Sequence, residues 1–145
     1  MSADPAAIVA CARAWIGTPY RHQASACGAG TDCLGLLRGI WRDSYGREPE
    51  DIPPYTADWS EPGGEERLWQ AAVRHLEPVE RNAALCPGQV VLFRMRDGSV
   101  AKHLGIIAET SGSASFIHAY SGHGVLESPL SGPWLRRVVA RFAFP

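Results

Sequence analysis

The chain has 145 residues, of which 46% are hydrophobic, so we expect one domain spanning residues 1–145 with a single core. Its 14 basic and 15 acidic residues give a formal net charge of −1, which argues against nucleic acid as a partner. No apolar run approaches the roughly 18 residues of a transmembrane helix, so membrane insertion is not expected.

Three helices are predicted in the first half of the chain. The first begins at the N-cap Asp4 with Pro5 in its first turn and ends at Gly17. The second begins near Thr31 or Asp32 and ends at Gly46, and its Gly35 and Gly39 favour close packing against a neighbour. The third covers about 65–76. Between the last two lies a proline-rich loop over 48–64, of the length that is usually functional or mobile.

The second half of the chain changes to an extended pattern. We predict five strands, over 89–95, 102–109, 114–120, 125–128 and 135–144. Helices followed by strands joined by short turns indicate an α+β fold, with N-terminal helices packed on a C-terminal antiparallel sheet of about five strands.

Cys33 is the leading candidate for a catalytic residue. A glycine-rich loop precedes it, so it falls in the first turn of the second helix, where free backbone N–H groups and the helix dipole favour a thiolate. The other cysteines, Cys11, Cys27 and Cys86, form no Cys-x-x-Cys pair, so neither a zinc site nor any other cofactor is expected. A regulatory disulfide between Cys27 and Cys33 stays an open alternative.

His103 and His118 are the candidate partners of Cys33. A hairpin centred between Thr110 and Ser111 would place the two histidines directly opposite each other on one face of the sheet. If Cys33 packs against that face, His103 takes the thiol proton to form an ion pair, and His118 holds the ring of His103 in the productive tautomer. The role of His22, near Tyr20, stays open.

Five segments, in order, resemble the NlpC-type papain-like cysteine peptidases that cut bacterial cell-wall peptides. They are Gly17-Thr-Pro-Tyr-Arg, Asp32-Cys33-x-Gly35-Leu, Leu85-Cys-Pro-Gly-Gln-Val-Val-Leu-Phe, His103-Leu-Gly-Ile-Ile and Ile117-His118-Ala. The resemblance spans most of the chain and implies a papain-like fold and a thiol hydrolase that degrades peptidoglycan.

The resemblance also implies the role of each residue. Cys33 would be the nucleophile, His103 the base and His118 the polar orienter. Tyr20 would place its hydroxyl near the oxyanion or the substrate, and Asp32 would help to bind the free amine of a stem peptide. The bond cleaved would be the γ-D-glutamyl–diamino-acid bond of peptidoglycan.

Leu34 departs from the family pattern, which has serine directly after the cysteine. Leucine there, and an N-terminus without the pattern of a secretory signal, resemble the branch found in phage tails and gene-transfer particles. This implies synthesis in the cytoplasm, incorporation into such a particle, tail proteins as partners and action at the cell wall. Two alternatives stay open, namely an amidase or acyltransferase on the same fold and a noncatalytic tail subunit.

Overall fold

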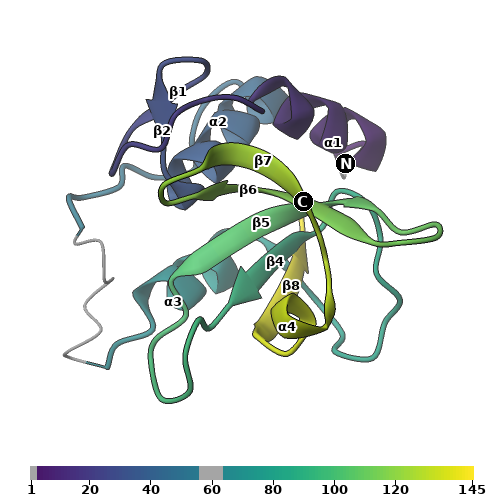
Figure 1. Ribbon diagram of the computed structural model, residues 1–145. Helices are drawn as coiled ribbons and strands as arrows, with labels where there is room; N and C mark the ends of the chain where they lie inside the picture. The colour runs from purple at the N-terminus through teal and green to yellow at the C-terminus, as the bar shows by residue number, and fades with distance from the viewer. Residues whose placement is uncertain (1–2, 56–63) are drawn as a thin grey trace.

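A computed structural model describes residues 3–55 and 64–145 of the chain (Figure 1). Its first two helices are α1 (Pro5–Ala14) and α2 (Cys33–Tyr45). Asp4 caps α1 by accepting a hydrogen bond from the Ala6 N–H, and Asp32 caps α2 by accepting one from the Gly35 N–H. Gly46 ends α2 in the left-handed conformation, with φ of 86°. The caps at Asp4, Asp32 and Gly46 are as predicted, whereas α1 ends at Ala14 and not at the predicted Gly17.

Helix α2 lies unusually close to its neighbours. A Cβ on Gly35 would lie 1.9 Å from the carbonyl oxygen of Ala24, and one on Gly39 would lie 2.0 Å from the Trp15 ring. The segment before α2 forms a small hairpin of β1 (Ser25–Ala26) and β2 (Gly30–Thr31). The glycines therefore seat the start of α2 tightly against this hairpin and against the end of α1.

The main sheet has six antiparallel strands in the order β3-β8-β4-β5-β6-β7. The strands are β3 (Glu77–Val79), β4 (Val90–Phe93), β5 (His103–Glu109), β6 (Ser115–Tyr120), β7 (Gly124–Pro129) and β8 (Val138–Ala143).

Five of these strands were predicted, and β3 was not, because Pro78 was interpreted only as the stop of helix α3 (Arg67–His75). Proline is tolerated there since β3 is an edge strand. The last strand was predicted from residue 135, but β8 begins at Val138, and Leu135 ends the short helix α4 (Gly132–Leu135), which was not predicted.

The sheet buries different side chains on its two faces. Helices α1, α2 and α3 pack on one face, against residues that include Val90, Leu92, Leu104, Ile106, Ile117 and Phe142. The alternate residues of the same strands, Val91, Phe93, Ile107 and Phe116, form a second cluster together with Leu130, which follows β7. Trp134 of α4 packs against this cluster. The molecule is thus an α+β fold whose sheet is covered on both faces.

The two ends of the described chain meet, since the Ala3 N–H donates to the carbonyl oxygen of Pro145 at 3.0 Å. Within residues 3–55 and 64–145, no helix combines the length and apolar character that crossing a bilayer requires. Part of the predicted 48–64 loop, residues 56–63, lies outside the described residues.

Candidate active site

A cavity of about 150 Å³ brings together residues from opposite ends of the sequence. Four of the five predicted site residues line it: Tyr20, Asp32, Cys33 and His103. Cys33 is the first residue of α2, and its thiol donates to the carbonyl oxygen of Lys102 at 3.7 Å. Lys102 directly precedes His103, the first residue of β5, so the thiol lies at the end of the strand that carries the proposed base.

His118 lies behind His103. Nε2 of His103 is 2.8 Å from Nδ1 of His118, and the rings meet edge to face. Because Nε2 of His103 is engaged in this contact, Nδ1 is the nitrogen left to exchange a proton with the thiol. His118, the fifth predicted residue, therefore contacts His103 and does not line the cavity.

The register that joins the two histidines differs from the prediction. Ile106 pairs with Ile117, and Ile107 pairs with Phe116, so His118 lies opposite Gly105 and diagonally to His103. The shift equals two residues along one strand, so it keeps both histidines on the same face. An irregularity between Ile107 and Glu109 accompanies it, and turn composition alone does not predict such an irregularity.

The histidines also lie on a different face from the one expected. His103 pairs with Phe93, whose side chain belongs to the cluster under α4 and not to the face under α1 and α2. The Trp134 ring centroid is 5.7 Å from that of His103 and 5.2 Å from that of His118. Cys33 therefore reaches His103 around the end of β5, rather than by packing against the histidine face.

Ser128 is the third member of a row of polar contacts that runs from His103 through His118. Its hydroxyl oxygen lies 2.8 Å from Nε2 of His118. If the His118 Nε2–H donates to Ser128, then Nδ1 of His118 accepts from the Nε2–H of His103, and Nδ1 of His103 is left unprotonated and basic. This is the tautomer that a general base acting on Cys33 requires.

Burial governs the protonation of the site. It raises the pKa of the Cys33 thiol to about 12, and the charge of Asp32 acts in the same direction. Hydrogen bonds from the backbone N–H groups of Leu104, Leu34 and Cys33 lower this pKa, as expected at a helix start, but their effect is smaller. Burial thus opposes the stabilisation of the Cys33 thiolate that is expected at a helix start.

Burial also favours the neutral form of the two imidazoles. Burial lowers the pKa of His103 to about 3 and that of His118 to about 4, since desolvation disfavours the charged ring. Both shifts favour the neutral thiol and the neutral imidazole over the expected ion pair.

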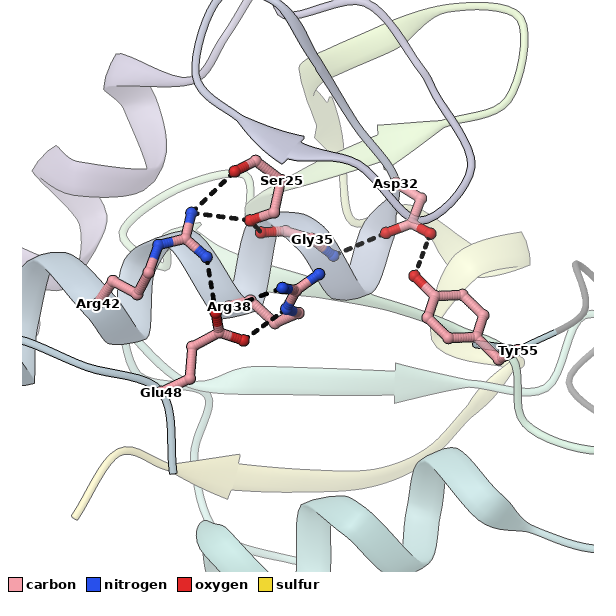
Figure 2. A network of polar contacts seen from close by, with 7 residues as sticks. All are labelled: Ser25, Asp32, Gly35, Arg38, Arg42, Glu48 and Tyr55. Carbon is pink, nitrogen blue, oxygen red and sulfur yellow. Dashed lines mark hydrogen bonds and ion pairs between the residues drawn. The ribbon is translucent and has the colours of Figure 1, made fainter. Parts of the chain in front are cut away.

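Asp32 is the centre of a polar network (Figure 2). One carboxylate oxygen accepts from the Gly35 N–H and the other from the Gln23 N–H, each at 2.7 Å, and the second oxygen also accepts from the Tyr55 hydroxyl. Gln23 has φ of 65°, a conformation that non-glycine residues rarely adopt. Asp32 thus fixes both the start of α2 and a strained turn of the preceding loop.

The 48–55 segment is tied to α2 at its other end as well. Glu48 forms ion pairs with Arg38 at 2.5 Å and Arg42 at 3.1 Å, and Arg42 also donates to the Ser25 carbonyl at 2.8 Å (Figure 2). Residues 48–55 of the predicted 48–64 loop therefore lie along α2, and they bring Tyr55 to the cavity.

The remaining sequence candidates are less central. Tyr20 is half-buried, and desolvation and the nearby Cys33 and Asp32 raise its pKa to about 12. His22 lines the cavity and contacts the Tyr55 carbonyl oxygen at 2.8 Å. Cys27 is exposed and all four cysteines are free thiols, so a disulfide with Cys33 is not present. In the part of the chain that the structure describes, no three His, Cys, Asp or Glu side chains gather as a metal site would require.

Comparison with known proteins identifies the family. The model of the NlpC/P60 family matches residues 17–142. The chain belongs to the NlpC/P60 family. This is a family of cysteine peptidases that includes peptidoglycan hydrolases.

Murein DD-endopeptidase MepS/Murein LD-carboxypeptidase of Escherichia coli (strain K12) is 30% identical over 123 residues, which cover 85% of this chain and 53% of that protein. The chain thus spans about half the length of this curated relative. The NlpC/p60 domain of the peptidoglycan hydrolase SagA has a TM-score of 0.64 at 23% identity, with 97% of this chain and 99% of that chain covered. An NlpC/P60 family protein from Bacillus cereus ATCC 10987 has a TM-score of 0.65 at 16% identity, with 97% and 40% covered. Both structures share the fold.

Sequence reasoning missed three residues of this NlpC/P60 site: Tyr55, Ser128 and Trp134. Tyr55 follows two prolines in an irregular segment, and Trp134 belongs to the short helix α4, which was not predicted. Ser128 could have been found, because it lies one strand beyond His118 and on the same face, but only once the pairing of β6 with β7 is known.

Proposed function

We propose that the chain is a peptidoglycan endopeptidase in which Cys33 is the nucleophile, His103 the general base and acid, and His118 the residue that orients His103. The observation that carries this proposal is the 2.8 Å contact between His103 and His118 beside the thiol at the start of α2. The family of the chain supports the reaction class.

The reaction would proceed in two steps. Nδ1 of His103 takes the thiol proton of Cys33 as sulfur attacks the amide carbon, and the backbone N–H of Cys33 at the helix start stabilises the oxyanion. The C–N bond then breaks, and the proton on His103 passes to the leaving amine. Water hydrolyses the thioester, with His103 taking one proton from it, and the free acid and thiol are restored.

The proposed substrate is a stem peptide cleaved at its γ-D-glutamyl–diamino-acid bond. Tyr20 would lie near the oxyanion or the substrate, and Asp32 would bind the amine of the peptide. A carboxylate has about four lone-pair sites, and three donors already occupy Asp32. An amine would therefore bind at the remaining site, on the carboxylate oxygen that accepts from the Gly35 N–H.

We also propose that the protein acts at the cell wall as part of a phage-like tail particle, with tail proteins as its partners. The support is Leu34, which stands where the family pattern has serine and which resembles the branch found in such particles. The domain would then comprise residues 1–145 as a single unit.

The test is incubation with purified muropeptides, followed by mass analysis of the products. The native protein should release a fragment with a new free amine on the diamino acid, and Cys33→Ala should release none. Cys86→Ala is the matched control, because Cys86 is an exposed thiol outside the cavity. No cleavage by the native protein, or equal cleavage by Cys33→Ala, would contradict the proposal.

A further inference from the structure

A groove of about 520 Å³ that adjoins the active-site cavity is lined by five arginines. They come from three separate stretches of the chain and are Arg81, Arg94, Arg96, Arg136 and Arg137. Asp97 is the one acidic residue among the described residues that line the groove. Met95 lines both the groove and the active-site cavity, so the two spaces lie next to each other along the chain that follows β4.

Two of the arginines are held in place by the protein. Arg94 pairs with Glu66 at 3.1 Å and donates to the Ser99 carbonyl at 2.6 Å. Arg137 donates to the carbonyl oxygens of Met95 and Pro133, and its guanidinium lies 5.9 Å from the centroid of the Trp134 ring. Since carbonyl oxygens and an aromatic face carry no formal charge, Arg137 keeps its positive charge unneutralised.

Arg81 and Arg136 are exposed, and neither has an acidic partner at ion-pair distance among the residues that the structure describes. Outside the groove, Arg13 pairs with Glu109 and Glu127, and Arg38 and Arg42 share Glu48. Three arginines outside the groove, Arg21, Arg47 and Arg141, form no ion pair with a described residue either, but they do not line one cavity together. Unneutralised positive charge is therefore concentrated in this groove, although the net charge of the chain is −1.

Guanidinium groups bind carboxylates through two parallel hydrogen bonds, and a groove lined by one sign of charge concentrates ligands of the opposite sign. A peptide bound across Cys33 that continues past Met95 enters this groove. We propose that the groove binds the free carboxylates of the stem peptide and so makes the enzyme selective for unamidated peptides. This inference rests on the proposed function and names the substrate class of the same site.

The experiment measures binding by calorimetry, with the Cys33→Ala protein so that no peptide is consumed. The two probes are an alanyl-γ-glutamyl-diaminopimelate tripeptide and its counterpart whose side carboxylates are carboxamides. We expect the carboxamide form to bind about tenfold more weakly, on the order of threefold for each of two exposed arginine–carboxylate pairs. Adding Arg81→Gln and Arg136→Gln should reduce this ratio to about twofold or less.

Arg47→Gln is the matched control, because it removes one exposed positive charge that lies outside both spaces, and it should leave the tenfold ratio intact. An equal affinity for both peptides, or a ratio that survives loss of Arg81 and Arg136, would overturn the inference. Arginine-dependent binding of a glycerol-phosphate polymer that exceeds binding of the carboxylate peptide would also overturn it, in favour of a phosphate ligand.

Cleavage by the native protein separates this inference from the proposed function. Binding that depends on the carboxylates and arginines, without cleavage of the tripeptide, would support the groove and contradict the endopeptidase. Cleavage without discrimination between the two peptides would support the endopeptidase and contradict the proposed selectivity of the groove.

Discussion

The hydrogen bond from the Tyr55 hydroxyl to Asp32 offers a quantitative test of how the cavity is assembled. The carboxylate of Asp32 is 2% exposed and accepts from two backbone N–H groups as well as from Tyr55. Tyr55→Phe removes one donor and leaves the ring in place. Desolvation and the negative charge of Asp32 both raise the pKa of Tyr55, so the hydroxyl remains a donor throughout the working pH range.

A hydrogen bond to a charged group contributes about 1.5–3 kcal/mol, and the half-buried position of Tyr55 favours the lower end. We therefore expect Tyr55→Phe to lower the free energy of unfolding by about 1.5 kcal/mol. Asp32→Asn keeps an acceptor for Gly35 but turns an amide N–H₂ toward the Gln23 N–H, which we expect to cost about 2 kcal/mol. The double variant should cost about 1 kcal/mol less than the sum of the two, because both substitutions remove the same bond.

The measurement is urea unfolding at pH 7 followed by tryptophan fluorescence, with the two single variants and the double variant forming a cycle. Tyr45→Phe is the control, since the Tyr45 hydroxyl donates to the neutral carbonyl of Pro145 at 2.6 Å and its loss should cost only about 0.5–1 kcal/mol. Additive costs, or a Tyr55→Phe cost no larger than that of Tyr45→Phe, would refute the central position of Asp32.

Two further predictions concern the histidines. In the unfolded chain both His103 and His118 bind protons below about pH 6.5. In the folded chain the pKa of His103 is about 3 and that of His118 about 4, so the rings stay neutral until the pH is much lower. The free energy of unfolding should therefore fall as the pH drops from 6.5, by up to about 2 kcal/mol per histidine at pH 5. In urea unfolding, His118→Asn should show roughly half of the native slope, whereas a native slope near zero between pH 5 and 7 would show that the rings are not buried in neutral form. Ser128→Ala should lower kcat about 3–10-fold with little change in KM, by releasing the tautomer of His118, and Ser128→Thr should restore activity. Ser111→Ala, in the exposed β5–β6 turn, is its control, and an unaltered kcat in Ser128→Ala would exclude this positioning role.

Local signals in the sequence were enough for the helices that position the site. Asp4, Asp32 and Gly46 act within a few residues of the helix ends that they define, so their effect is visible without knowledge of the tertiary structure. The same is true of Cys33, whose place in the first turn of α2 follows directly from the cap at Asp32.

Properties that depend on distant parts of the chain were not predictable in this way. The pairing of His118 with Gly105 depends on an irregularity near Glu109, and the face of the histidines depends on where α4 packs. The pKa of the Cys33 thiol is a further case. The helix start that favours its thiolate is a local feature, whereas the burial that raises its pKa exists only in the folded chain.

Leu34 acquires a physical meaning from the same loop. Leu34 is 6% exposed, and it lines one cavity together with Ile52, Pro54 and Tyr55. A serine would place a hydroxyl there with little apolar surface, whereas leucine gives the 52–55 segment an apolar support. That segment delivers the Tyr55 hydroxyl to Asp32. Leu34 and Tyr55 are therefore two parts of one arrangement, in which an apolar side chain of α2 supports the loop whose hydroxyl donates to the carboxylate beside Cys33.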